Sequence, residues 1–231
     1  MKKCYLCVVN RLDSEIQLTA DGSATLYRPD IDEHYHSVKG AVAESRHVYV
    51  DCGLRYRAAS GASGQGLTVL EIGFGTGLNA ALSVDAADVP VRYVSLELYP
   101  LDPDMVKTMG YDSVSGRISA VNDAPWDVDT SITPRFMLCK QRADFTVCEL
   151  PQNIDVVYFD AFAPEKQPEM WSRDCFERIY AAMSPGGVLT TYCAKGAVRR
   201  MLQDVGFEVQ RIEGPAGGKR EILRAIRPVE D

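Results

Sequence analysis

Short apolar runs recur from residue 67 onward, separated by segments in which apolar residues return at helical spacing. In one such segment Val198, Leu202 and Val205 share a face, and Gly206 marks the end of the helix. Strands alternating with helices predict an α/β fold with a mostly parallel sheet of seven strands. The predicted strands are residues 68–73, 92–97, 135–140, 155–161, 187–193, 207–212 and 220–226. A short loop joins the last two, which predicts an antiparallel pair at one edge of the sheet.

The N-terminal residues follow a different pattern. Extended pieces at 4–9 and 16–19, with a turn at Asp21-Gly22, predict a β-rich N-terminal extension over residues 1–60. The stretch SGASGQG at 60–66 is typical of a flexible connector. We therefore expect the main domain to span residues 61–231.

Composition and charge narrow the class of protein. The 231 residues are 46% hydrophobic and 25% charged, as in an ordinary globular domain. A net charge of −7 argues against a protein that coats nucleic acid by bulk attraction. No apolar run approaches the roughly 18 residues of a membrane span, and the N-terminus does not resemble a signal peptide. Seven cysteines without regular spacing fit reduced thiols, so we expect a cytoplasmic protein without a membrane partner.

A glycine-rich turn follows the first strand of the main domain. In EIGFGTGLN, Gly73, Gly75 and Gly77 have a spacing that differs from the dinucleotide-binding fingerprint. Such a turn lets a ligand approach the backbone without meeting a β-carbon. Glu71 at the end of the strand would disfavour a phosphate and suits a ligand that carries a cation.

Two further acids follow the next strands. Glu97 could accept hydrogen bonds from both hydroxyls of a ribose, and Asp144 from the amino group of an adenine. Alternatively, each acid merely caps a loop. Taken together with the glycine turn, the acids favour S-adenosyl-L-methionine, which has an ammonium and a sulfonium but no phosphate.

Asp160 ends the fourth strand, in the stretch DAFAPEKQPEMWS. Ligands of open α/β sheets bind at this carboxyl edge. A primary amine with a pKa near about 10 must lose a proton before it can accept a methyl group. The Asp160 carboxylate could attract and orient the ammonium and help to remove that proton. Phe162 could pack near the acceptor, although core packing is the alternative for both Phe162 and Trp171.

Several stretches resemble the MnmC/MnmD-type tRNA methyltransferases, over roughly residues 17–227. The resemblance is carried by EIGFGTGLN, by DAFAPEKQPEMWS, by the segment 184–223 that begins SPGGVLTTYC, and by DEHYHS and ESRHVYV in the N-terminal part. It implies a Rossmann-like class I methyltransferase fold and S-adenosyl-L-methionine as cofactor. It also implies methylation of 5-aminomethyl-2-thiouridine to 5-methylaminomethyl-2-thiouridine at the wobble position in the anticodon loop of tRNA.

The family's site residues carry over by motif. Glu71, Gly73, Gly75, Gly77, Asn79, Glu97 and Asp144 would hold the cofactor, and Asp160 would face the amine. Two-domain members also carry a flavin-dependent oxidase half, for which 231 residues leave no room. The chain is therefore expected to be a stand-alone methyltransferase module, whose aminomethyl substrate comes from another enzyme or route.

Basic residues gather near the C-terminus. Residues 195–227 contain eight lysines and arginines against four acids, in a chain that is acidic overall. Lys219 and Arg220, in the loop of the expected hairpin, are predicted to contact tRNA, with a solvated charged face as the alternative. Tyr35 could lie over the cofactor or over an extruded base, or pack at a strand edge.

Other site chemistries are disfavoured. Cys4 and Cys7 form a single C-x-x-C pair without a second one, and the three histidines lack a metal-binding pattern, so we expect no metal. Two other functions stay open. An aminopropyltransferase would share the sheet and an acid beside an amine but needs no cationic face, and a non-catalytic tRNA-binding protein need not keep Asp160 and the glycine turn.

Overall fold

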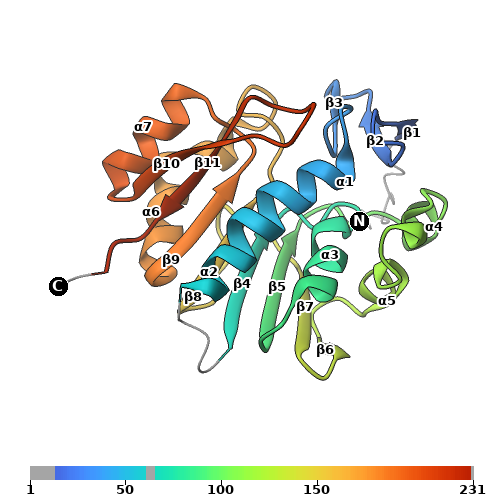
Figure 1. The fold of residues 1–231 in the computed structure, drawn as a ribbon, viewed down its shortest axis with the longest axis horizontal. Helices are drawn as coiled ribbons and strands as arrows, with labels where there is room; N and C mark the ends of the chain where they lie inside the picture. The colour runs from blue at the N-terminus through green and yellow to red at the C-terminus, as the bar shows by residue number, and fades with distance from the viewer. Residues whose placement is uncertain (1–13, 61–65, 230–231) are drawn as a thin grey trace, which may run out of the picture.

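The centre of the molecule is an eight-stranded sheet with the order β10-β11-β9-β8-β4-β5-β7-β6 (Figure 1). The structure is a computed structural model that describes residues 14–60 and 66–229. The strands are β4 (Leu67–Ile72), β5 (Val91–Glu97), β6 (Asp129–Thr133), β7 (Phe136–Arg142), β8 (Ile154–Phe159), β9 (Met183–Thr191), β10 (Glu208–Glu213) and β11 (Glu221–Ile226). The run from β9 through β8, β4 and β5 to β7 is parallel. β6, β11 and β10 are added antiparallel at the two edges.

This sheet confirms the predicted fold class and the antiparallel pair at its end. All seven predicted strands are present, but the predicted number of strands is wrong by one because β6 was missed. The β6 sequence DTSIT is largely polar and pairs only with β7, at the edge of the sheet. A strand with one neighbour and little burial need not carry the alternation of apolar residues by which strands are recognised.

The order of the strands determines where a ligand can bind. Along the chain, β4 is followed by β5 and β7 on one side, and β8 and β9 are then added on the other side of β4. The chain connections thus reverse direction at β4 and β8. In open α/β sheets the crevice at the carboxyl ends of strands beside such a reversal is the usual binding place.

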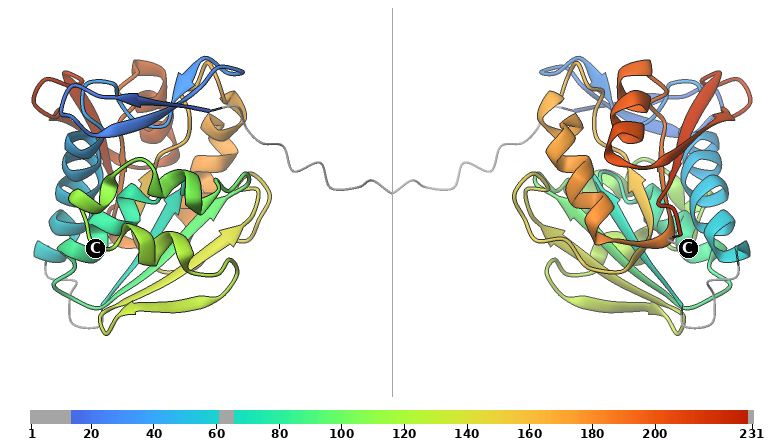
Figure 2. Two further views of the ribbon diagram at one scale, coloured as in Figure 1. Left: turned by 90° about the vertical axis from the view of Figure 1, so that its right-hand side faces the viewer. Right: turned by 90° about the vertical axis from the view of Figure 1, so that its left-hand side faces the viewer.

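Helices cover both faces of the sheet (Figures 1 and 2). One face is covered by α1 (Ala41–Glu44), η1 (Ser45–Arg55), α2 (Tyr56–Ala59), α3 (Leu78–Ala86), α4 (Pro103–Lys107), η2 (Tyr111–Ser113) and α5 (Ile118–Asp123). The other is covered by η3 (Pro168–Trp171), α6 (Arg173–Ala182) and α7 (Gly196–Val205). Each face of the sheet packs against its helices in a separate hydrophobic core, and successive residues of β8 point alternately into the two cores. Val156 and Tyr158 belong to the first core, and Val157 and Phe159 to the second. This alternation follows from the pleat of a strand buried on both faces.

The N-terminal part is only partly extended. The strands β1 (Glu15–Leu18), β2 (Ala24–Arg28) and β3 (Glu33–His34) form a small antiparallel sheet above the carboxyl ends of the central strands (Figure 2). Ala24 and Leu26 join the first core, so the extension packs on the main sheet. The strand predicted at 4–9 and most of the connector lie outside the described residues, and the boundary near residue 60 stays a prediction.

Residues 41–59 fall within the predicted β-rich extension but form one helix whose middle part, η1, is π-helical. Its valines, tyrosines and Gly53 disfavour a helix when judged locally. Packing reverses this preference, since Val48, Tyr49 and Leu54 are buried. A β-carbon on Gly53 would lie 2.9 Å from the ring of Tyr158, so the glycine lets the helix approach the sheet. Within residues 14–60 and 66–229, no helix has both the length and the apolar character needed to cross a membrane.

Candidate active site

A cavity of about 820 Å³ opens at the carboxyl ends of β4, β5 and β8. Its walls come from the segments that follow β4, β5, β7, β8 and β9, from residues 33–38, and from the loop between β10 and β11. The volume is that of an ordinary small-molecule site. Among the predicted site residues, those that line it are Tyr35, Gly73, Gly75, Glu97, Asp144, Asp160, Phe162, Lys219 and Arg220.

The glycine turn forms one end of the cavity. Gly73 has a φ of 93° and Gly75 a φ of 50°, both in the region that favours glycine. A β-carbon on Gly73 would lie 2.9 Å from the backbone oxygen of Asp160, and one on Gly75 would lie 3.0 Å from Cδ1 of Tyr35. The turn therefore needs glycine for its backbone angles and for its close neighbours. Gly77 begins α3 and lies beneath the cavity rather than in its lining.

Glu97 and Asp144 face the cavity from neighbouring strands. The Glu97 carboxylate accepts hydrogen bonds from the backbone N–H of Gly75, at 3.1 Å, and of Tyr99, at 2.9 Å. Asp144 accepts from the backbone and hydroxyl of Thr146 at 2.8 and 2.6 Å. Both acids thus order loops and line the cavity as well. A carboxylate oxygen can accept more than one hydrogen bond, so both acids keep capacity for a ligand.

These donors and acceptors suit an adenosyl group. Two carboxylates offer acceptors for ribose hydroxyls and for an adenine amino group, and the charge of Glu97 would repel a phosphate placed at the glycine turn. Burial raises the pKa of Glu97, and hydrogen bonds from backbone N–H groups oppose that shift. The residues present therefore fit S-adenosyl-L-methionine better than a dinucleotide, while the role of each residue stays a prediction.

Glu71 is placed differently from our expectation. Its side chain is completely buried and is not part of the cavity lining, so it offers no direct contact to a ligand's cation. Oε2 accepts a hydrogen bond from Ser95 Oγ at 2.6 Å, whereas Oε1 has no partner among the described residues. Burial raises the pKa of Glu71 to about 8. At neutral pH this carboxyl group is therefore mostly protonated.

Replacing Glu71 by glutamine should stabilise the protein at alkaline pH. Glutamine mimics the neutral acid and can still accept from Ser95. Between the unfolded pKa of about 4.3 and the folded pKa of about 8 the folded protein binds this proton more strongly, so wild-type stability falls as pH rises through this window. We expect the variant and the wild type to have similar melting temperatures at pH 5. At pH 9 the variant's free energy of unfolding should be higher by more than about 1 kcal/mol, which raises its melting temperature by roughly 2–4 °C or more. A difference that does not change with pH would contradict a protonated Glu71; Glu149→Gln, at an exposed position, serves as control.

Asp160 lies at the floor of the cavity with both oxygens held. Tyr49 Oη donates to Oδ1 at 2.5 Å, and Asn79 Nδ2 donates to Oδ2 at 2.8 Å. Burial raises the pKa of Asp160 to about 7; the hydrogen bond from Tyr49 opposes this shift, and the charge of Glu44 adds to it. Asn79, predicted to bind the cofactor, thus orients Asp160 from outside the cavity lining. Tyr49 was not singled out from the sequence, although ESRHVYV, which contains it, carries part of the resemblance.

Aromatic residues form another wall. The rings of Tyr35 and Phe162 meet edge to face, with centroids 5.2 Å apart, and both line the cavity. Burial and the charge of Glu97 raise the pKa of Tyr35 to about 12, so its hydroxyl is neutral. Trp171 is buried in the second core and donates to the backbone oxygen of Phe162 at 2.7 Å. The core-packing alternative therefore describes Trp171, while Phe162 faces the cavity.

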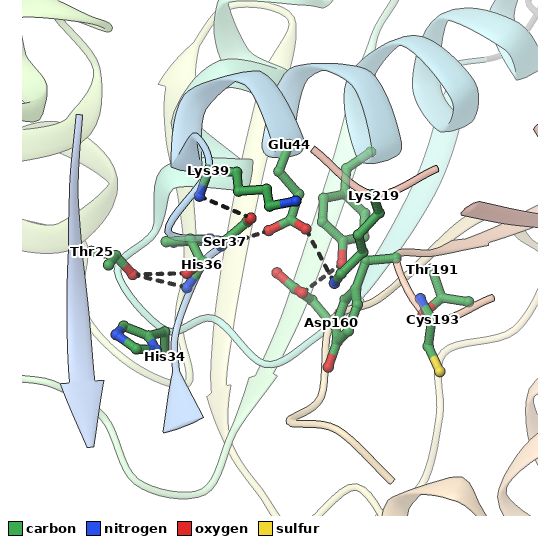
Figure 3. A network of polar contacts seen from close by, with 12 residues as sticks. Thr25, His34, His36, Ser37, Lys39, Glu44, Asp160, Thr191, Cys193 and Lys219 are labelled. Carbon is green, nitrogen blue, oxygen red and sulfur yellow. Dashed lines mark hydrogen bonds and ion pairs between the residues drawn. The ribbon is translucent and has the colours of Figure 1, made fainter. Parts of the chain in front are cut away.

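The basic C-terminal residues do not form one uniform face. Lys219 turns into the cavity, where Nζ lies 3.4 Å from Glu44 Oε1 (Figure 3). Arg224 stacks on Tyr56, and Arg227 donates to the backbone oxygens of Tyr180, Ala181 and Met183. Arg220 is exposed at the cavity rim, and Arg200 is exposed on α7. Both residues of the pair predicted to contact tRNA are exposed, but Lys219 is engaged with Glu44, and the contact with tRNA stays a prediction.

The three histidines lie apart in separate hydrogen bonds. His36 is buried and bonds Thr76 at 2.9 Å, which ties the N-terminal sheet to the glycine turn. His34 bonds Gln17, and His47 bonds the backbone oxygen of Glu213. In the part of the chain that the structure describes, no three His, Cys, Asp or Glu side chains form a group that could hold a metal ion. Cys4 and Cys7 lie outside that part.

Comparison with known proteins agrees with this geometry. A family model described as S-adenosyl-L-methionine-dependent methyltransferase matches residues 130–228. Proteins described as tRNA 5-methylaminomethyl-2-thiouridine biosynthesis bifunctional protein MnmC are similar to the chain. The one from Pseudomonas fluorescens is 31% identical over 84% of this chain and 32% of its own length. The one from Cupriavidus necator is 30% identical over 91% and 34%. The chain thus spans about a third of the length of the curated relatives it matches.

Solved structures give the same result. The crystal structure of MNMC2 from Aquifex aeolicus superposes with a TM-score of 0.72 at 26% identity, covering 96% of this chain and 74% of that one. Spermidine synthase from Thermotoga maritima has a TM-score of 0.54 at 15% identity, covering 94% and 73%. The second likeness shows a shared fold alone.

Proposed function

Because the chain is related to the MnmC-type proteins and has the class I fold of S-adenosyl-L-methionine-dependent methyltransferases, we propose that it methylates a tRNA amine. The proposed reaction converts 5-aminomethyl-2-thiouridine at the wobble position to 5-methylaminomethyl-2-thiouridine, in the cytoplasm. The observation that carries the proposal is Asp160, a carboxylate oriented by two donors at the floor of a cavity that also contains the glycine turn and Glu97.

S-adenosyl-L-methionine, the cofactor of this family, supplies an electrophilic methyl group on a sulfonium when it is bound. We propose that Glu97 and Asp144 bind its adenosine and that Gly73 and Gly75 let it come close to the backbone. The bare turn allows close approach, and the two acids supply the acceptors that an adenosyl group needs. Asp160 lines the same cavity, so a cofactor held by these residues would share it with the acceptor amine.

Asp160 prepares the acceptor. Its carboxylate attracts the protonated aminomethyl group and accepts one proton from it, which leaves a neutral amine with a free electron pair. With the cofactor bound, the neutral amine would form the new N–CH₃ bond as the S–CH₃ bond breaks, and the sulfur would leave as a neutral thioether. Tyr49 and Asn79 hold the carboxylate in one orientation, which would fix the position of the amine nitrogen for in-line transfer.

The test is transfer of labelled methyl from S-adenosyl-L-methionine to tRNA that carries 5-aminomethyl-2-thiouridine. Label on the wobble nucleoside supports the proposal. Absence of label in every such tRNA, with cofactor binding intact, would refute it. Decarboxylated S-adenosylmethionine with putrescine, tested in parallel, decides whether the chain acts as an aminopropyltransferase.

Replacing Arg200 and Arg220 together by alanine should weaken tRNA binding. Both side chains are exposed, and an arginine that binds a phosphate releases counterions from the nucleic acid. We expect the slope of log Kd against log salt to fall by roughly 0.7–0.9 for each arginine–phosphate pair that the substitutions remove, with cofactor affinity unchanged. Filter binding across a salt series measures the slope. As a control, Arg55→Ala removes an exposed arginine on η1 outside the cavity lining. An equal effect of this control would mean that binding depends on overall charge.

A further inference from the structure

A lysine of the chain itself occupies the part of the cavity next to Asp160. Figure 3 shows Lys219 between Glu44 and Asp160, with the three side chains pointing toward one another. We propose that Glu44 and Tyr192, together with Asp160, form the binding site for the acceptor's ammonium group, and that Lys219 holds this site in the free protein and leaves it when the substrate binds. The inference rests on the proposed function, since it names the residues that select an amine.

Glu44 supplies a buried negative charge. It ends α1, and its side chain is only 9% exposed. Oε2 accepts from the backbone N–H of Ser37 at 2.9 Å, which leaves Oε1 for a cation, and Lys219 Nζ lies 3.4 Å from it. A carboxylate buried to this extent requires a charged or hydrogen-bonding partner. Each oxygen of Glu44 therefore has an interaction partner only when a cation is present.

Tyr192 supplies an aromatic face. Lys219 Nζ lies 3.5 Å from the centroid of its ring, the geometry of a cation–π contact. Tyr192 Oη donates to the backbone oxygen of Ala161 at 2.9 Å, and this fixes the ring next to the residue that follows Asp160. An acid and an aromatic ring on one ammonium form a site that recognises a compact organic cation.

The ligand class follows from the chemistry of the present occupant. A lysine side chain ends in CH₂–NH₃⁺, and a protonated aminomethyl group ends in the same atoms. The two cations cannot occupy the site together, and without either of them Glu44 and Asp160 face each other across the cavity as like charges. The charge of Lys219 lowers the pKa of Asp160 and that of Glu44 raises it, which shows that both act on this carboxyl group.

Lys219 is placed to leave. Its side chain is 41% exposed, and it sits in the loop between β10 and β11, where Gly217 has a φ of 74°. An ion pair with one partly exposed member is readily exchanged. Lys195 provides a contrast: it also lines the cavity and pairs with a glutamate, Glu165, but both of these side chains are substantially exposed.

Binding of n-butylammonium tests the site without tRNA or methyl transfer. In Lys219→Ala the site is vacant, and we expect n-butylammonium to bind roughly tenfold or more tighter than to wild type, measured by calorimetry. Lys195→Ala, the matched control, should bind it no better than wild type. Adding Glu44→Gln to Lys219→Ala should remove the gain, because glutamine keeps the bond from Ser37 but not the charge. Adding Tyr192→Phe should preserve the gain, and Tyr192→Leu should reduce it.

Equal n-butylammonium affinity in wild type, Lys219→Ala and Lys195→Ala, with all three folded by circular dichroism, would overturn the inference. The outcome does not depend on the proposed reaction. If the site binds n-butylammonium but tRNA is never methylated, the amine site stands and the proposed substrate is wrong. If tRNA is methylated but the variants do not differ in n-butylammonium binding, the reaction stands and the role of Lys219 is wrong.

Discussion

Asp160→Asn should lower the rate of methyl transfer about 10²–10⁴-fold, the usual contribution of a positioned general base. Asparagine has nearly the same shape and keeps an oxygen that can accept from Tyr49, but it can neither take a proton nor attract an ammonium. Single-turnover transfer of labelled methyl under saturating cofactor measures the loss. Cofactor affinity, measured by calorimetry, is expected to stay close to that of wild type, which separates this effect from damage to the cavity.

The pH dependence provides a second readout of the same residue. Burial raises the pKa of Asp160 to about 7, so its reactive carboxylate form is depleted below that pH. We expect kcat/KM of the wild type to decrease as the pH falls below 7. The low residual activity of Asp160→Asn should not show this decrease. Stability should change in the opposite sense: as pH rises from about 4 to 7, wild type should lose more stability than the variant, which lacks the contribution of Asp160 and keeps that of Glu71. If the activity of Asp160→Asn also decreases below pH 7, another group is responsible for the decrease.

Glu97→Ala should weaken binding of S-adenosyl-L-methionine by about 10²–10⁴-fold. Two hydrogen bonds to a charged group contribute roughly 1.5–3 kcal/mol each, and every 1.4 kcal/mol is tenfold in affinity. Calorimetry with S-adenosylhomocysteine measures the loss without turnover. Because the change also removes the acceptor for the Gly75 and Tyr99 backbone N–H groups, the melting temperature is measured alongside.

Two further variants test whether the loss of affinity is specific to the Glu97 carboxylate. Glu97→Gln keeps an acceptor without charge and should fall between alanine and wild type. Glu149→Ala removes an exposed acid that is not part of the cavity lining and should leave the affinity unchanged. Unchanged affinity in Glu97→Ala would remove Glu97 from the adenosyl site and would send the search to Asp144.

The sequence was most informative where local pattern and fold coincide. The strands of the sheet are apolar because both of their faces are buried, and residues after parallel strands must meet at one edge of the sheet. Glu97, Asp144 and Asp160 could therefore be predicted to lie together from their positions alone. Glu71 also lies near the end of β4, but the pleat of the strand directs its side chain into the protein beside Ser95, away from the cavity.

The residues that the sequence did not reveal come from tertiary packing. Tyr49 bonds an acid 111 positions away, and Glu44 meets Lys219 across 175 positions. Both depend on the helix over 41–59, whose local propensity favours an extended chain and which forms because it packs on the sheet and on α3. A β-rich extension over residues 1–60 does not predict this helix, and the positions of its side chains cannot be predicted without it.

The loop between β10 and β11 enters the cavity from the opposite side to the glycine turn, because the last two strands form a hairpin added to the edge of the sheet next to β9. Its Lys219 and Arg220 line the cavity, and none of residues 214–220 belongs to the segments that follow β4, β5 or β7. The lysine that occupies the proposed amine site thus comes from a stretch of chain separate from the residues to which we assign the cofactor. Exchanging this one loop between relatives is consequently expected to change how readily the proposed amine site opens to a substrate, with cofactor affinity preserved.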